Sequence, residues 1–137
     1  MSRSLDLAPV PSSVRQARDW IRSYAVEHGR AADVDTLVLL VSELVSNVVL
    51  HARTPCVLEA SSSDDGTVRV EVRDGVAALP RVGRPRADDA VSGRGLLLVE
   101  SMASAHGADL LADGGKRVWF ELAAGPRPEP PTAGPGR

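Results

Sequence analysis

Three polar side chains recur every four residues within an otherwise apolar stretch of the sequence: Glu43, Asn47 and His51. On an α-helix this spacing places them on one face, one turn apart. There the carboxylate could activate a hydroxyl group, and the amide oxygen could bind a hard cation. The same stripe could also be a solvated helix face, and the spacing alone does not choose between the two interpretations.

A second candidate is the pair Asp74-Gly75, which follows a segment of alternating apolar and charged residues. Such pairs are common in turns, where glycine adopts backbone angles that other residues avoid. The functional alternative is a carboxylate at the end of a buried strand that accepts a hydrogen bond from an amino group such as that of adenine. Gly75 would then let the ring approach the backbone closely.

The third candidate is Ser92-Gly93-Arg94-Gly95, which stands immediately before an apolar segment that begins with Leu96. Bare backbone amides beside a helix N-terminus favour phosphate oxygens. The run lacks the third glycine of a dinucleotide-binding fingerprint and follows a loop instead of a strand, and the chain contains no Walker A sequence. A plain turn from a loop into a helix is the alternative.

Helices are predicted at three places in the chain. The strongest pattern runs from Asp33 to Ala52, which contains no glycine or proline and repeats its apolar residues at helical spacing. An earlier helix with Ser12 or Ser13 as its N-cap is expected to stop at Gly29. A short apolar helix is expected over Leu96 to Ala105.

Strands are expected where apolar and polar residues alternate between turn signals. The clearest runs from Val68 to Arg73, whose valines point to one side and whose charged residues point to the other. Asp64-Asp65-Gly66 and Asp113-Gly114-Gly115 predict the turns of two hairpins. The other expected strands are Ser2 to Leu7, Cys56 to Ala60, Ala108 to Leu111 and Arg117 to Leu122.

Two segments show no sustained period. Val76 to Ser92 contains glycine, prolines and scattered arginines, which predicts a long mobile loop. The tail from Gly125 holds half of the ten prolines and is predicted to be disordered. One domain over residues 1–123, followed by a Pro/Gly-rich tail over 124–137, is therefore the predicted organisation.

Composition argues against several classes of protein. The 137 residues are 43% hydrophobic, which is enough for one domain with a real core. With 16 basic and 18 acidic side chains the net charge is -2, so nothing favours nucleic acid. The single Cys56 cannot form an intramolecular disulfide or a cysteine-rich metal site, and we find no signal peptide or long apolar span. We therefore expect a soluble cytoplasmic protein that contacts no membrane.

Taken together and in this order, the three candidates resemble one superfamily. Val41 to Ala52 is similar to the N-box of the ATPase domains of DNA gyrase, heat-shock chaperones and histidine kinases. Val72-Arg73-Asp74-Gly75 resembles its first glycine box, and Gly93-Arg94-Gly95-Leu96 resembles its second. Within the superfamily, the small size and the ending Gly114 to Phe120 are similar to the anti-sigma regulatory factor kinases of actinobacteria. The likeness spans Leu5 to Leu122.

The resemblance implies a role for each candidate. Glu43 would be the general base toward a serine or threonine hydroxyl, and Asn47 would coordinate the magnesium ion that bridges the phosphates of ATP. Asp74 would read adenine, and Gly75 would allow the base to approach closely. His51 matches a recurrent N-box histidine, for which a packing role at the helix end is an alternative.

The resemblance also places Gly93-Arg94-Gly95-Leu96 against the phosphates and makes Val76 to Ser92 the ATP lid. The sequence departs from the family at two points. Val76-Ala77-Ala78 stands where the fuller first box has another glycine. Lys116-Arg117 stands where many relatives place a threonine that helps to hold the adenine.

The implied fold is an α/β two-layer sandwich, a Bergerat ATP-binding fold, in which a mostly antiparallel sheet of about five strands is covered on one face by three helices. The implied function is a protein serine/threonine kinase that uses ATP and Mg²⁺, phosphorylates an anti-sigma-factor antagonist and sequesters a sigma factor, as a homodimer. The alternative is a non-catalytic adaptor that works by sequestering a partner. A dinucleotide-binding oxidoreductase fragment does not fit, because no βαβ unit surrounds Gly93 to Gly95.

Overall fold

The computed structural model describes residues 2–76 and 98–124 of the chain. Within them, five strands form one sheet in the order β1-β2-β3-β5-β4, and every neighbouring pair is antiparallel. Strand β3 is therefore central and has a neighbour on each side. The strands are β1 (Ser2–Leu7), β2 (Cys56–Ser62), β3 (Val68–Asp74), β4 (Ala105–Leu110) and β5 (Lys116–Leu122).

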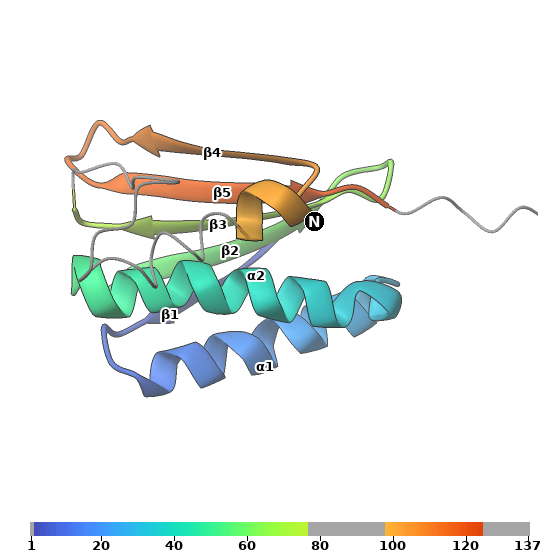
Figure 1. Cartoon of the computed structure of the whole chain (residues 1–137), viewed down its shortest axis with the longest axis horizontal. Helices are drawn as coiled ribbons and strands as arrows, with labels where there is room; N and C mark the ends of the chain where they lie inside the picture. Colours follow the sequence, from blue (N-terminus) through green and yellow to red (C-terminus); the bar gives the residue numbers. More distant parts are fainter. Residues whose placement is uncertain (1, 77–97, 125–137) are drawn as a thin grey trace, which may run out of the picture.

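The helices cover one face of this sheet (Figure 1). Helix α1 (Ser12–Glu27) packs beside α2 (Val34–Asn47), which follows a 3₁₀ turn (Ala31–Asp33) and leads into a π turn (Val48–Ala52). Residues 98–102 are also helical, and Leu98 and Val99 pack against the same core. The predicted α/β sandwich of a five-stranded antiparallel sheet and three helices is confirmed.

The core lies between the helices and the inner face of the sheet. Val68, Val70 and Val72 on β3 are at most 1% exposed, as the alternating pattern of this segment predicts. Leu58 on β2 and Phe120 on β5 are fully buried beside them. Burying each such side chain contributes about 1.5 to 3 kcal/mol to the stability of the domain. The buried residues of α2 are Leu37, Leu40, Val41, Ser42, Leu44 and Val45.

The start of α1 differs from the prediction. Neither Ser12 nor Ser13 is the N-cap, because Pro11 precedes the helix and already has helical angles, which the proline ring favours. The Ser13 hydroxyl instead donates to the Ala8 carbonyl, 2.7 Å away. At the other end Gly29 has a φ of 73°, so the predicted stop is confirmed.

The predicted helix from Asp33 to Ala52 is not uniform. After Asn47 the backbone widens into the π turn, and the run ends at Arg53, which has a left-handed φ of 56°. The Arg53 N–H donates to the Val48 carbonyl at 2.7 Å, an i→i+5 bond. Such turns are rare and are frequently found at functional sites.

The helical run Ala31–Ala52 also corrects the expectation that the chain has no long apolar span. The run has 22 residues, and an 18-residue window within it has a mean hydropathy of 1.6, so it is long and apolar enough to cross a membrane by length and composition. In this fold, however, Leu37, Leu40, Val41 and Leu44 are buried against the sheet and α1. A core helix meets the same criteria, so the run needs no membrane to account for it.

The last hairpin begins earlier than predicted. Strand β4 starts at Ala105, so the prediction that the preceding helix reaches Ala105 is wrong at its end. The strand predicted over Ala108 to Leu111 in fact begins three residues earlier. Ala105 pairs with Glu121 on β5, and Gly107 lies opposite Trp119. A Cβ atom at Gly107 would lie 2.7 Å from the indole ring, so only glycine fits beneath it.

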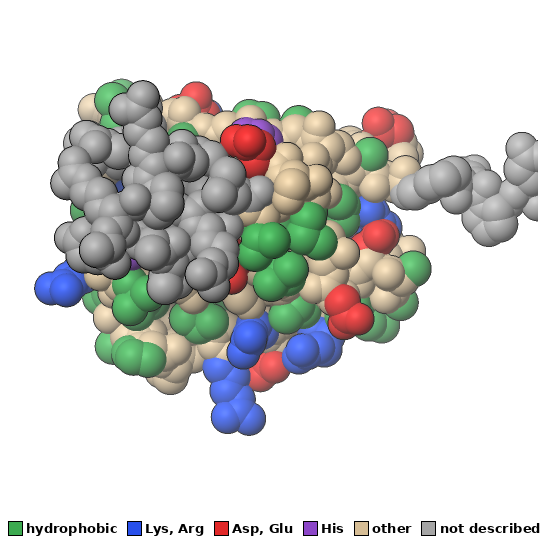
Figure 2. All heavy atoms as spheres, in the orientation of Figure 1, with side chains coloured by type: hydrophobic (Ala, Val, Ile, Leu, Met, Phe, Trp, Pro, Cys, Tyr) green, Lys and Arg blue, Asp and Glu red, His purple; other side chains and the backbone are tan. Residues whose placement is uncertain are grey.

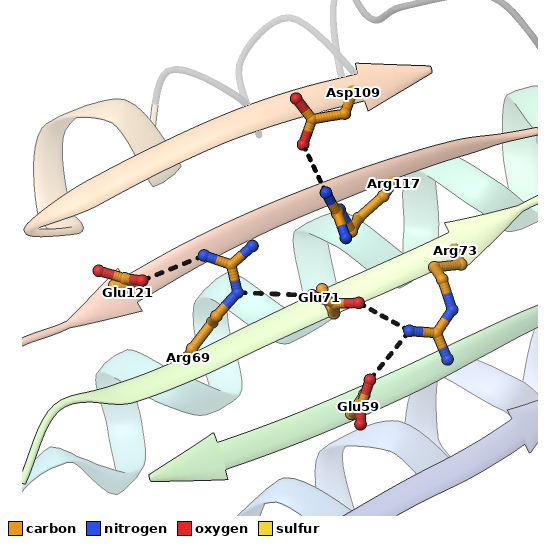
Figure 3. Close-up of polar contacts among 7 residues, drawn as sticks. All are labelled: Glu59, Arg69, Glu71, Arg73, Asp109, Arg117 and Glu121. Carbon is orange, nitrogen blue, oxygen red and sulfur yellow. Dashed lines mark hydrogen bonds and ion pairs between the residues drawn. The ribbon is translucent and has the colours of Figure 1, made fainter. Parts of the chain in front are cut away.

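The outer face of the sheet, away from the helices, carries an outer charge cluster (Figure 3), comprising Glu59, Arg69, Glu71, Arg73, Asp109, Arg117 and Glu121. Arg73 donates to Glu59 at 2.9 Å and to Glu71 at 2.7 Å, and these bonds, that to Glu59 above all, raise the pKa of the guanidinium. Arg69 lies 4.1 Å above the Trp119 ring. Figure 2 shows further basic side chains gathered over α1.

Candidate functional site

Two of the three polar residues predicted on the second helix stay together. Glu43 and Asn47 both lie in the regular part of α2, one turn apart, and both are half-buried. Among the described residues, neither side chain has a hydrogen-bond or ion-pair partner. Half-buried polar side chains can meet either water or a ligand, so the ligand site on this part of α2 stays a prediction.

The third residue, His51, is separated from them by the change in helix type. It lies in the π turn, where hydrogen bonds close i→i+5 and four-residue stacking no longer holds. Its side chain is exposed. The structure therefore does not bring His51 into one stripe with Glu43 and Asn47.

Asp74 ends the central strand and forms a buried ion pair. Its side chain is 1% exposed, and the Lys116 ammonium lies 3.0 Å from Oδ1 and 2.8 Å from Oδ2. The N–H of Val76 also donates to Oδ1, at 2.8 Å. The two residues face each other across β3 and β5, and a buried carboxylate without such partners would be costly.

This pair belongs to the last row of the inner face. Cys56 on β2 is the partner of Asp74 on the other side, and Leu7 on β1 is the partner of Cys56. Burial, and second the negative charge of Asp74, raise the pKa of the Cys56 thiol to about 11. The thiol is therefore protonated near neutral pH, and this end of the sheet combines apolar walls with one carboxylate and one ammonium group.

Gly75 is not a turn glycine in the usual sense. Its φ is not positive, whereas the described glycines with positive φ are Gly29, Gly66 and Gly114. Its N–H donates to the Thr54 hydroxyl at 3.0 Å, and a Cβ atom would only make ordinary contacts with Thr54 at 3.6 to 3.7 Å. The described residues therefore do not require glycine here, and the close approach of a base stays a prediction.

Sequence reasoning missed Gly115, which does have a structural reason. A Cβ atom there would lie 2.1 Å from the Asp74 carbonyl oxygen, so glycine lets β5 approach the end of β3. The only signal in the sequence was the turn Asp113-Gly114-Gly115, which does not distinguish the two glycines. The importance of Lys116 was likewise visible only as a departure from the family pattern.

The remaining site predictions lie outside the described residues. These are Gly93, Arg94, Gly95 and Leu96 of the second glycine box, and the lid except for Val76.

The described side chains fit magnesium-bound ATP. They contain no group of three or more acidic, histidine or cysteine side chains that could hold a metal ion by themselves. A magnesium ion that arrives with nucleotide phosphates needs only one or two protein ligands, and the Asn47 amide oxygen, which bonds to none of the described residues, could be one. A hollow of about 260 Å³ lined by Ser61, Asp65 and Glu121, among others, lies at the opposite end of the sheet and is not part of this site.

Two solved structures share this fold. The RsbU and RsbW domains of Rv1364c from Mycobacterium tuberculosis match with a TM-score of 0.63 and 22% identity, over 90% of this chain and 32% of that one. This chain thus spans about a third of that protein's length. The SiaB–SiaC complex from Pseudomonas aeruginosa matches with a TM-score of 0.59 and 13% identity, over 89% of both chains. Among curated proteins, none matches.

The family model of the histidine kinase-like ATPase domain matches residues 7–122, from the end of β1 to the end of β5. This range holds every candidate residue discussed above. The chain therefore belongs to the histidine kinase-like ATPase domain family.

Proposed function

We propose that this chain is an ATP-dependent protein serine/threonine kinase of the anti-sigma-factor type. The observation that carries the proposal is the pair of Glu43 and Asn47 on α2, in a domain of an ATPase family. Both side chains are half-buried, and neither uses its polar atoms on another described residue. A ligand that brings a metal ion and a hydroxyl group would supply polar partners for both side chains.

Asp74, Gly75 and Asn47 form the proposed binding part of the site. The Asp74 carboxylate accepts a hydrogen bond from the adenine amino group, and Gly75 leaves room for the base. The Asn47 amide oxygen binds the magnesium ion. The bound nucleotide and its metal supply the phosphoryl group and neutralise part of its charge. The proposed phosphate contacts are Gly93, Arg94, Gly95 and Leu96. For His51, which lies in the π turn, the proposed role is packing at the end of the helix.

Glu43 is the proposed catalytic base. It lies four residues, about 6 Å of helix rise, before Asn47, so a hydroxyl that reaches Glu43 stands beside the metal site. Its carboxylate takes the proton as the hydroxyl oxygen attacks the terminal phosphorus, while the bond from that phosphorus to the bridging oxygen breaks and ADP leaves. A positioned base of this kind typically contributes about 10²- to 10⁴-fold to the rate.

The proposed phosphate acceptor is a partner protein, an anti-sigma-factor antagonist, and the proposed sequestered target is a sigma factor. Two similar folds support a protein partner: one is called an RsbW domain, and the other was solved as a complex of SiaB with SiaC. We further propose that the chain acts as a homodimer, as the family resemblance implies.

A non-catalytic adaptor is the second candidate, and one observation favours it. Lys116 already occupies both oxygens of Asp74, the carboxylate that would read adenine. If the ion pair excluded the base, the domain would keep its shape and its partner surface without binding nucleotide.

The test is phosphotransfer to a bound partner. The purified chain is incubated with labelled ATP, Mg²⁺ and candidate antagonists, and phosphoserine and phosphothreonine are located by mass spectrometry. The kinase proposal expects one site on a partner that also binds in a pull-down, and no transfer when Mg²⁺ is chelated. A partner that binds tightly and is never phosphorylated would replace the kinase with the adaptor.

A further inference from the structure

Lys116 stands at the point where the proposed function needs an open carboxylate. Its side chain is 11% exposed and that of Asp74 is 1% exposed, so the ion pair is almost fully withdrawn from water. The antiparallel register sets the two residues opposite each other. Gly115, packed against the Asp74 carbonyl, holds β5 close to β3 at this point. The ammonium group is therefore a built part of the site.

The hydrogen-bond capacity of the pair is not exhausted. A carboxylate offers about four acceptor positions, and an ammonium group offers three N–H donors. Oδ1 accepts from Lys116 and Val76, and Oδ2 accepts from Lys116 alone. Counted over residues 2–76 and 98–124, one acceptor position on Oδ2 and one N–H of Lys116 remain, so the pair offers an acceptor and a donor side by side.

A base that displaced Lys116 would leave an ammonium group buried without its counter-charge. That penalty exceeds what one new hydrogen bond to the base returns. A base that enters with the ion pair intact avoids the penalty and uses both free positions. Sharing is therefore favoured over displacement.

We propose that Lys116 is a specificity-determining residue of the nucleotide site, which remains bonded to Asp74 and donates its free N–H to the base. The inference rests on the proposed function. In adenine, the exocyclic amino group donates to Asp74, and the neighbouring ring nitrogen N1 accepts from Lys116. The base is thus read at two adjacent atoms.

The test compares ATP with 1-deaza-ATP, in which a C–H group replaces N1, by calorimetry on the full chain with Mg²⁺. The wild type is expected to bind 1-deaza-ATP at least about tenfold more weakly, because a hydrogen bond from a charged donor is lost. Lys116→Met is expected to bind both nucleotides equally and ATP more weakly than the wild type does. Arg117→Met is the matched control, since Arg117 is the next residue on the strand and pairs with Asp109 on the outer face. It should keep the wild-type ratio.

Each outcome decides a separate point. Equal binding of the two nucleotides by the wild type, or tighter ATP binding by Lys116→Met, would overturn this inference and leave the kinase proposal standing. No ATP binding by the wild type at millimolar concentrations would overturn the proposed function and this inference with it. Circular dichroism checks the fold. If Lys116→Met does not fold, Lys116→Gln retains an N–H donor and should still prefer ATP; loss of that preference would contradict the proposal.

Discussion

The two faces of the same sheet carry ion pairs in opposite surroundings. In the outer charge cluster, the side chains of Arg69 and Glu121 are 31% and 34% exposed, whereas Asp74 and Lys116 on the inner face are 1% and 11% exposed. Water stabilises separated charges on the outside and cannot do so on the inside. The same kind of contact is therefore replaceable on one face and required on the other, where the proposed site lies.

Asp74→Asn should have the largest effect on stability. The substitution leaves the Lys116 ammonium buried without a counter-charge, which should cost about 3 kcal/mol of unfolding free energy, the lower end for a broken buried pair. Urea denaturation followed by circular dichroism measures it. Asp109→Asn, which breaks an exposed pair with Arg117, is the control and should cost less than about 1 kcal/mol. Equal, small losses in both variants would abolish the contrast between the faces.

Gly115→Ala should come next, because its Cβ atom would lie 2.1 Å from the Asp74 carbonyl oxygen. Forcing β5 away from β3 should cost about 1 to 3 kcal/mol, as for other overpacked positions. Gly75→Ala is the matched control, since its Cβ atom would make only ordinary contacts. The control should change stability by about 0.5 kcal/mol or less. If Gly115→Ala unfolds at the same urea concentration as the wild type, the strands are not held as closely as described.

Cys56 gives an intermediate effect that appears only at high pH. Its folded pKa of about 11 lies above the ordinary thiol value of 9.0, so the folded state disfavours the thiolate. The corresponding stability is fully present below pH 9 and is lost as pH rises through about 11. Urea denaturation of the wild type and Cys56→Ser from pH 8 to pH 11 checks it. The two stability curves should differ in slope above pH 9; parallel curves would show that the thiol is not perturbed.

Glu121→Gln on the outer face should have the smallest effect. It removes the 3.1 Å contact with Arg69, whose guanidinium still lies over the Trp119 ring. The loss should stay below about 1 kcal/mol and shrink as salt is added. Thermal unfolding at low and high salt measures it. A loss as large as that of Asp74→Asn would place the outer cluster among the structural elements of the domain.

The alternating and helical patterns predicted the elements that build the core. The inner face of β3 was predictable from Val68, Val70 and Val72, and the end of α1 from Gly29, because both signals lie within the local sequence. The fold class followed from the resemblance together with these elements.

Features that depend on distant residues were not predictable in the same way. The Asp74–Lys116 pair joins residues 42 positions apart, and it exists only because β3 and β5 pair in one particular register. The π turn after Asn47 has no signature in the apolar pattern, which continues through it. It separates His51 from Glu43 and Asn47, whose four-residue spacing suggested a single stripe.

The most direct test of the central claim separates binding from chemistry on α2. Glu43→Gln should retain magnesium-dependent ATP binding and partner binding but lose phosphotransfer by at least about a hundredfold, because only the base is removed. Asn47→Ala should lose both magnesium-dependent binding and transfer, because it removes a metal ligand. Asp35→Asn, an exposed carboxylate on the same helix, should match the wild type in both. Calorimetry and partner phosphorylation are measured on the same preparations. Transfer at the wild-type rate by Glu43→Gln would contradict the account.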